Sequence, residues 1–204
     1  ILLINPGSNL RKPGSAEPLP LLSLAGTLEQ QGIQVEILDG AISEITLDKL
    51  SGYQTFGVTS TTPQYPNALE ILKKIQDLQK ETGEPVKTLL GGPHATVFKD
   101  KVLKDGWSTV CIGEGDLVIG DMVTGKLRGI VRGIQVKNLD CLPHPARHLV
   151  NQQYIREGDS EPSISIVGMR GCPYSCIYCT KEITGTKVRY RSVHNIVEEI
   201  QQVR

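Results

Sequence analysis

The sequence predicts an α/β fold, in which a Rossmann-like domain with a five-stranded parallel sheet is followed by one strand–helix unit of a second domain. Short apolar runs alternate with helical patterns through residues 1–112. A further strand, a cysteine-rich loop and an amphipathic helix follow near the C-terminus. Strands that alternate with helices form parallel sheets covered on both faces. The expected strand order is the flavodoxin-like one, 2-1-3-4-5.

The five strands are expected where short apolar runs end in glycine-rich or polar turns. These runs are residues 1–4, 35–38, 55–59, 86–90 and 109–112. Helices are expected where apolar residues share one face at the 3.6-residue spacing. The first helix ends at Gly32, and a longer one begins at Pro66. Residues 44–51 and 95–104 are expected to form shorter helices.

The rest of the chain divides into a linker and a second domain. Residues 127–139 are expected to form two short extended pieces at the end of the first domain, which spans residues 1–139. Residues 140–162 contain prolines, Gly158 and many polar side chains, which is typical of a linker. Residues 163–204 then form the N-terminal part of the second domain.

Composition narrows the function classes. The chain has 204 residues, of which 39% are hydrophobic and 22% charged, as in ordinary globular proteins. The net charge is zero, so there is no basic footprint for nucleic acid. No apolar run has the length of a membrane span, and no secretory signal is evident. Five cysteines without a secretory pattern indicate a reducing compartment, and we expect the cytoplasm.

Three cysteines lie in one short loop after the strand expected at residues 163–167. Cys172, Cys176 and Cys179 have the spacing C-x3-C-x2-C. Three thiolates in so tight a loop suit a 4Fe–4S cluster, in which each iron takes one thiolate. One iron is then left open for chemistry. Ser192 is the expected N-cap of the helix that follows.

Other interpretations of the cysteine loop remain. Zinc would need a fourth protein ligand, which Cys141 or a histidine could supply. Cys176 and Cys179 form a C-x-x-C pair that could act as a redox dithiol, although its context is not thioredoxin-like. A disulfide framework is disfavoured by the odd number of cysteines.

A ligand site is expected at the carboxyl edge of the sheet, near the switch in strand order. Glycines there allow close approach of a large ligand, and hydroxyl groups supply polar contacts. The candidate binding residues follow the strands in chain order and are Asn5, Thr59, Ser60, Thr61, Gly91, Gly92, His94, Gly113 and Glu114. There is neither a Walker A pattern nor a G-x-G-x-x-G that opens a helix, so nucleotide binding is not favoured.

The cysteine loop resembles the signature C-x3-C-x-aromatic-C of the radical S-adenosylmethionine (SAM) family. Tyr178 is the aromatic residue, and the resemblance implies that it lies against the SAM adenine. It also implies that SAM chelates the open iron and that one electron from the cluster cleaves SAM to a 5′-deoxyadenosyl radical. The expected fold around the loop is the first βα unit of a partial (β/α) barrel, most of which lies outside this chain.

The whole layout resembles the cobalamin-binding members of that family. The resemblance rests on several short motifs in order, which are residues 91–94 (GGPH), 113–116 (GEGD), 142–147 (LPHPAR), the cysteine loop and residues 188–192 (VRYRS). It implies that the sheet edge holds cobalamin. The motif D-x-H-x-x-G, whose histidine binds cobalt in other cobalamin domains, is absent, because the corresponding residues 5–10 read NPGSNL. Cobalamin is therefore expected base-off, without a histidine ligand.

Several residues have more than one interpretation. His94 could contact the corrin or act as a local hydrogen-bonding group. Glu114 is expected to cap a helix start rather than to take part in catalysis. Cys111 is expected to be a small buried apolar residue. Arg189 and Arg191 are expected to be solvated at the surface.

The expected function is therefore that of a cobalamin-dependent radical SAM enzyme. The resemblance implies methyl transfer to an unreactive carbon, with cyclisation or rearrangement as further outcomes. The substrate, a small molecule or a peptide, and the catalytic residues are not identified, and a flavodoxin- or ferredoxin-type protein is the expected electron donor. Two alternatives remain: a radical SAM enzyme whose Rossmann domain has lost cobalamin, and a cofactor-binding or electron-transfer module without catalysis of its own. The chain by itself is expected to be inactive.

Overall fold

The computed structural model describes residues 1–8, 16–150, 154 and 163–202, and its main feature is a parallel sheet of six strands. The strand order is β2-β1-β3-β4-β5-β6. The strands are β1 (Leu2–Asn5), β2 (Glu36–Asp39), β3 (Thr55–Thr59), β4 (Lys87–Gly91), β5 (Thr109–Ile112) and β6 (Gly129–Arg132). The flavodoxin-like order of the first five is confirmed. The sixth strand, which comes from the predicted extended pieces, pairs in parallel with β5 and enlarges the predicted sheet.

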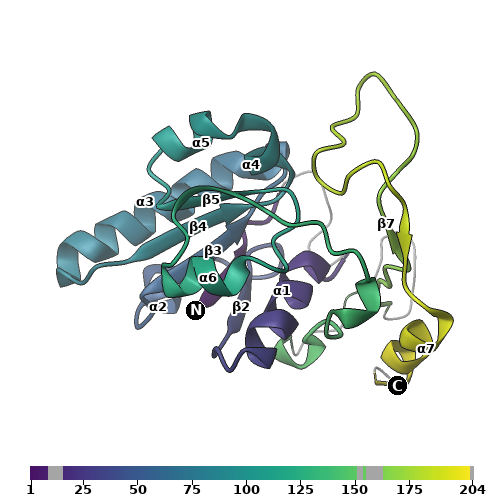
Figure 1. Cartoon of the computed structure of the whole chain (residues 1–204). Helices are drawn as coiled ribbons and strands as arrows, with labels where there is room; N and C mark the ends of the chain where they lie inside the picture. The colour runs from purple at the N-terminus through teal and green to yellow at the C-terminus, as the bar shows by residue number, and fades with distance from the viewer. Residues whose placement is uncertain (9–15, 151–153, 155–162, 203–204) are drawn as a thin grey trace.

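Helices cover both faces of this sheet (Figure 1). The helices of the N-terminal region are α1 (Leu19–Gln30), α2 (Leu47–Leu50), α3 (Tyr65–Thr82), α4 (Pro93–Phe98), α5 (Asp100–Lys104) and α6 (Ile119–Thr124), and a 3-10 turn (Thr62–Gln64) precedes α3. One helix was predicted over 95–104. It is divided into α4 and α5 at Lys99, whose φ of 40° interrupts the helix.

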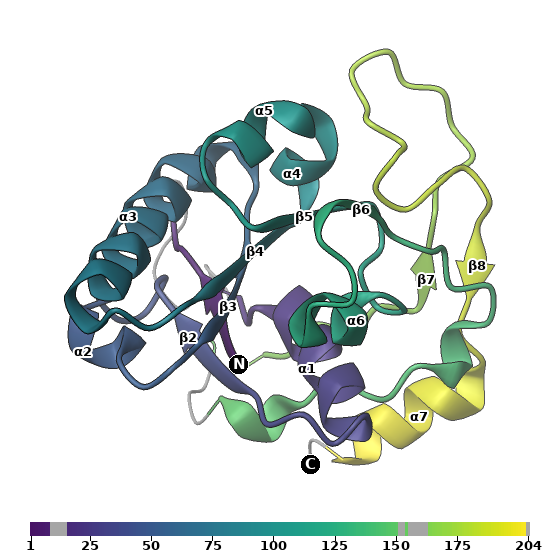
Figure 2. The ribbon, with the colours of Figure 1, turned by 60° about the vertical axis from the view of Figure 1, so that its left-hand side comes forward.

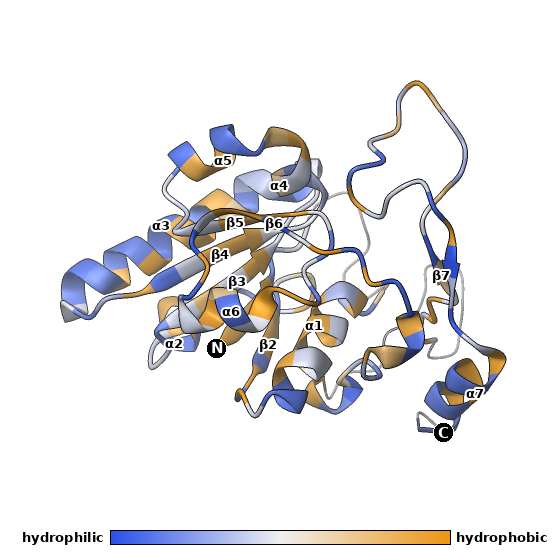
Figure 3. Ribbon diagram, in the orientation of Figure 1, coloured by the Kyte–Doolittle hydropathy of each residue, from blue (hydrophilic) through white to orange (hydrophobic). Residues whose placement is uncertain are grey.

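Two apolar clusters, one on each face, form the core. Leu2 and Ile4 of β1 pack into the cluster with α2, α3, α4 and α5, whereas Leu3 packs into the cluster with α1 and α6. Successive side chains of a strand point to opposite faces, so the apolar run of β1 serves both clusters. The two layers of helices are seen from another side in Figure 2. The apolar residues concentrate in the strands and on the inner sides of the helices, and α3 presents its polar side outward (Figure 3).

The C-terminal part has two short strands and one helix. Strands β7 (Met169–Arg170) and β8 (Arg189–Tyr190) pair antiparallel, and helix α7 spans Val193–Gln202. The Ser192 hydroxyl accepts a hydrogen bond of 3.2 Å from the Asn195 N–H, which confirms the predicted N-cap. None of the described helices is long and apolar enough to cross a membrane.

A strand was predicted at residues 163–167, and this position is wrong. The Ser165 N–H donates to the Glu17 carboxylate at 2.9 Å, and the Ser165 carbonyl accepts from Arg147 at 2.8 Å. The Ser165 N–H and carbonyl thus bond to side chains, whereas in a strand they would bond to the backbone of a neighbouring strand. Ile164 and Val167 are exposed, so the apolar residues of this run are not core residues. The strand forms instead at Met169–Arg170, where β8 supplies a partner.

Candidate functional site

The carboxyl edge of the sheet brings most of the predicted binding residues together. Strands β1, β3 and β4 end at Asn5, Thr59 and Gly91, and Thr59 pairs directly with Gly91. Gly113 follows β5 at the same edge. Because the strands are parallel, these residues lie along one side of the molecule, where open α/β sheets bind their ligands.

Backbone contacts hold the ends of β3 and β4 close together. The Ser60 N–H donates to the Gly91 carbonyl at 3.0 Å, and the His94 N–H donates to the Ser60 carbonyl at 2.9 Å. Gly92 has a φ of +93°, and a Cβ there would lie 2.9 Å from both the Ser60 carbonyl oxygen and the Thr59 hydroxyl. This position therefore requires glycine, both for its backbone conformation and for space.

Asn5 is held by a hydrogen-bond network that the sequence did not reveal. Its amide donates to the buried Asp39 carboxylate at 2.7 Å and accepts from Gln64 at 2.9 Å. Tyr154, which is also buried, donates to the other Asp39 oxygen at 3.0 Å. Burial and the Asp39 charge raise the pKa of the Tyr154 hydroxyl, so it stays protonated as a donor. The network fixes the carboxyl end of β1.

His94 lies in a local aromatic stack. Its ring stacks on Tyr65 at a centroid distance of 3.9 Å and contacts Phe98 at 4.3 Å. Its Nδ1 atom lies 3.2 Å from the Thr62 hydroxyl, and burial lowers its pKa. The ring is 7% exposed. The structure thus shows the local hydrogen-bonding role, and a contact between His94 and a corrin stays a prediction.

The other three histidines are tied to partners away from this edge. His144 hydrogen-bonds Gln202 at 3.0 Å, and His148 lies 2.9 Å from the Glu29 carboxylate. His194 lies 3.3 Å from Glu198 on the surface of α7. All four histidines of the chain are among the described residues. None of them presents an uncovered ring at the carboxyl edge.

Glu114 and Asp116, directly after β5, hold two arginines from the C-terminal part. The Arg170 guanidinium contacts both Asp116 oxygens, at 2.7 and 3.1 Å. Arg189 donates to both Glu114 oxygens, one of them at 3.0 Å. Burial opposes the charge of Arg170, but Asp116 and Glu114 outweigh it and raise the pKa of its guanidinium.

Three predictions about these charged residues were wrong. Glu114 does not cap a helix, since α6 begins only at Ile119; its carboxylate instead accepts from the Val136 N–H at 3.1 Å and pairs with Arg189. Arg189 is 7% exposed rather than solvated. Arg191 is also covered and pairs with the buried Glu199. Each side chain has a distant partner that the sequence pattern does not display.

The three cysteines lie in the loop between β7 and β8, and all three are exposed. The loop extends along the side of α4, next to the carboxyl end of β5 (Figure 2). The carboxylate of Glu182, a residue of this loop, contacts Lys99 at 2.7 Å. The backbone carbonyl oxygen of Glu182 lies 3.5 Å from the position that a Cβ on Gly113 would occupy. Tyr178 is 89% exposed.

The cysteine side chains are not gathered around one point. Within the described ranges, no group of three or more histidine, cysteine, aspartate or glutamate side chains has an arrangement that could hold a metal ion. Cys141, the possible fourth zinc ligand, instead donates its thiol to the Asn138 carbonyl at 2.9 Å. The donor type of these three side chains fits an iron–sulfur cluster, which is held by cysteine thiolates.

Cys111 differs from the other cysteines, as predicted, because it is a buried core residue. Burial, with a smaller contribution from the Asp116 charge, raises the pKa of its thiol to about 11. At pH 8 only about 0.1% of this thiol would be thiolate, the reactive form. We expect a thiol reagent at pH 8 to label four cysteines in the native chain and five after denaturation. Rapid labelling of Cys111 in the native chain, located by mass spectrometry, would show that β5 is not packed as described.

Comparisons with known proteins show which family the parallel-sheet domain resembles. A family model described as "B12 binding domain" matches residues 11–123. The "Uncharacterized methyltransferase PH0819" of Pyrococcus horikoshii is 25% identical over 90% of this chain and 45% of its own length. The "Bacteriochlorophyllide d C-12(1)-methyltransferase" of Chlorobaculum tepidum is 27% identical over 98% of this chain and 44% of its own. The chain thus spans about half the length of these relatives.

A solved structure shares the fold. It is the radical S-adenosylmethionine methyltransferase TsrM from Kitasatospora setae with cobalamin and a [4Fe-4S] cluster bound. It matches 99% of this chain and 45% of its own chain, with a TM-score of 0.68 and 19% sequence identity. The likeness covers both the parallel sheet and the C-terminal part.

Proposed function

Because the chain belongs to the B12-binding domain family and is related to cobalamin-dependent radical SAM methyltransferases, we propose that it binds cobalamin at the carboxyl edge of the sheet and a 4Fe–4S cluster at Cys172, Cys176 and Cys179. The observation that carries the proposal is the position of the cysteine loop beside that edge, where the Glu182 carbonyl oxygen lies 3.5 Å from the Cβ position of Gly113. Two cofactors held this close together could act on one substrate. The proposed reaction is methyl transfer to an unreactive carbon.

The residues at the edge suit a large, flat cofactor. Gly91, Gly92 and Gly113 leave the strand ends without side chains, and Thr59 and Thr61 supply hydroxyl groups. Asn5 is tied to Asp39, and His94 is covered by Tyr65 and Phe98, so neither offers a free ligand atom for cobalt. The proposed binding mode is therefore base-off, without a histidine ligand.

The remaining cofactor contacts would come from the loop itself. When bound, the cluster would supply an electron to SAM, and cobalamin would carry the methyl group. Cys172, Cys176 and Cys179 would hold three irons and leave the fourth open. Tyr178, which is exposed and directly precedes Cys179, would contact the SAM adenine. A flavodoxin- or ferredoxin-type protein would reduce the cluster at this exposed loop, and the proposed compartment is the reducing cytoplasm.

Cluster reconstitution tests this assignment. We expect the chain, incubated anaerobically with iron and sulfide, to bind about four irons per chain. Its absorbance spectrum should then show the visible band of a 4Fe–4S cluster. Cys176→Ala should lose most of this iron, because one of the three thiolate ligands is gone. Cys141→Ala is the matched control, since Cys141 is also exposed but lies outside the loop. Equal iron in both variants would contradict the assignment, and binding of one zinc in place of iron would favour the zinc hypothesis.

A further inference from the structure

The two arginines bound by Glu114 and Asp116 stand at the two ends of the cysteine loop. Arg170 in β7 and Arg189 in β8 face each other as partners in the antiparallel pair. Residues 171–188, which include the three cysteines, form the loop that this pair closes. We call these four side chains, Glu114, Asp116, Arg170 and Arg189, the acid–arginine junction.

The acid–arginine junction is buried and specific. The Glu114 and Asp116 side chains are 3% and 6% exposed, and the Arg170 and Arg189 side chains are 20% and 6% exposed. A planar guanidinium that contacts both oxygens of a carboxylate fixes direction as well as distance. Arg189 also donates to the Val136 carbonyl, at 2.6 Å. The ends of the loop are therefore attached to the segment after β5 by charged hydrogen bonds shielded from water.

The other ionic attachment of this loop is weaker. Lys99 and Glu182 form their pair with side chains 34% and 51% exposed. Exposed pairs of single charges add little to stability because water and salt screen them. Among the described contacts, the acid–arginine junction is thus the main electrostatic link between the loop and the sheet.

The same short segment serves the proposed cobalamin site. Gly113 and Gly115 alternate with Glu114 and Asp116, so the glycines at the sheet edge and the acids of the junction are neighbours in sequence. We propose that Glu114 and Asp116 are positioning residues that fix the cluster loop relative to the cobalamin-bearing edge. This inference rests on the proposed function. It implies that occupancy of the edge and order in the loop are coupled, because both depend on residues 113–116.

Amide hydrogen exchange of the full chain tests the first part without any cofactor. In Asp116→Asn and Glu114→Gln, we expect the hydrogen-bonded amides of Cys172 and Gly185 to exchange at least about tenfold faster, the effect of losing one charged hydrogen bond. Protection of β1, β3 and β4 should stay as in the wild type, which verifies folding. Asp116→Glu, which keeps the charge, should retain most of the protection.

Asp121→Asn is the matched control, since Asp121 also pairs with a cation, Lys126, but both side chains are exposed and far from the loop in sequence. It should leave the exchange of the loop unchanged. Unchanged loop exchange in both Asp116→Asn and Glu114→Gln would overturn the inference. So would equal acceleration in Asp116→Glu and Asp116→Asn, because charge would then not matter.

Hydroxocobalamin tests the coupling. In the wild type it should slow exchange in the loop as well as at the sheet edge, whereas in Asp116→Asn it should slow exchange only at the edge. Protection of the loop by hydroxocobalamin in both proteins would overturn the coupling. If the wild type does not bind hydroxocobalamin, the proposed function fails, and the cofactor-free exchange still decides whether the junction positions the loop.

Discussion

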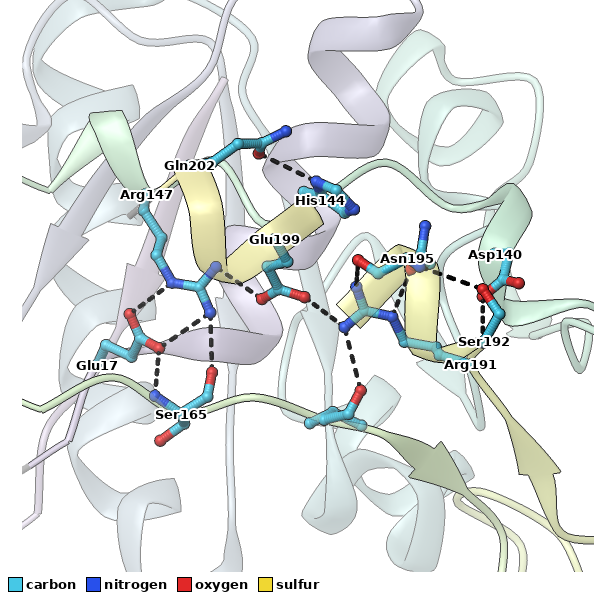
Figure 4. A network of polar contacts seen from close by, with 11 residues as sticks. Glu17, Asp140, His144, Arg147, Ser165, Arg191, Ser192, Asn195, Glu199 and Gln202 are labelled. Atoms are coloured by element: carbon cyan, nitrogen blue, oxygen red, sulfur yellow. Dashed lines mark hydrogen bonds and ion pairs between the residues drawn. The ribbon is translucent and has the colours of Figure 1, made fainter. Parts of the chain in front are cut away.

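Glu199→Gln is expected to release helix α7, with an acceleration of its amide exchange of about 100-fold. Glu199 is 1% exposed and lies between two arginines. Its carboxylate contacts Arg147 at 2.7 Å and also pairs with Arg191 (Figure 4). Removal of one partner from a buried ion pair leaves uncompensated charge and typically costs about 3 kcal/mol or more.

The effect should spread beyond the helix because Arg147 joins three segments. Its guanidinium also contacts Glu17 at 3.2 Å and the Ser165 carbonyl at 2.8 Å (Figure 4). Glu17 precedes α1, and Ser165 precedes β7, so these contacts connect the sheet domain with the C-terminal part. We therefore expect faster exchange at Ser165 as well as in α7.

Glu198→Gln is a control on the same helix. Glu198 is the adjacent residue, its side chain is 47% exposed, and among the described residues it pairs with the exposed His194. Its substitution should change α7 exchange by less than about threefold, as for exposed ion pairs. Equal effects of the two substitutions would show that Glu199 does not hold α7 in place.

Gly92→Ala is expected to destabilise the chain by about 2–4 kcal/mol and to abolish retention of cobalamin. Gly92 has φ 93° and ψ −174°, a conformation essentially restricted to glycine, and a side chain there costs about 1–3 kcal/mol by itself. The added Cβ would also lie 2.9 Å from the Ser60 carbonyl oxygen, so the ends of β3 and β4 must separate. That separation would deform the edge to which we assign cobalamin.

Gly83→Ala is the comparison at a positive-φ glycine without crowding, in the milder left-handed conformation. Gly83 caps α3 with a φ of +71°, and no atom lies within 4 Å of its Cβ position. Its substitution should cost only about 1 kcal/mol and leave cobalamin binding unchanged. Unfolding in urea and cobalamin retention after gel filtration measure both effects. A Gly92→Ala chain as stable as Gly83→Ala would contradict the close packing of β3 and β4.

Local sequence patterns were sufficient for the first five strands of the sheet and for their order. The apolar runs that form β1 and β5 are buried on both faces, and near-continuous apolar runs are typical of parallel strands. The β6 segment was expected only as extended chain, because its apolar pattern is short. In the structure its Ile130 is exposed, so this strand lacks the full apolar run of a buried strand. The strand expected at 163–167 failed for a different reason, since side chains of Glu17 and Arg147 occupy its backbone groups.

The polar contacts of the site could not be predicted in the same way. Arg189 and Glu114 are 75 residues apart, and Tyr154 and Asp39 are 115 apart. A buried ion pair depends on which segments the fold brings together, and neither residue displays its partner in its own sequence neighbourhood. The arginines next to the cysteine loop therefore resembled ordinary surface residues until the three-dimensional arrangement showed their carboxylate partners.

Anaerobic titration of the chain with hydroxocobalamin, followed by gel filtration and visible absorbance, tests the central claim most directly. The account predicts that about one cobalamin per chain is retained with a base-off spectrum, because the carboxyl edge has glycines for the corrin and no uncovered histidine for cobalt. A folded chain that retains no cobalamin would contradict the claim. A base-on spectrum, or one with a histidine ligand, would contradict the proposed binding mode.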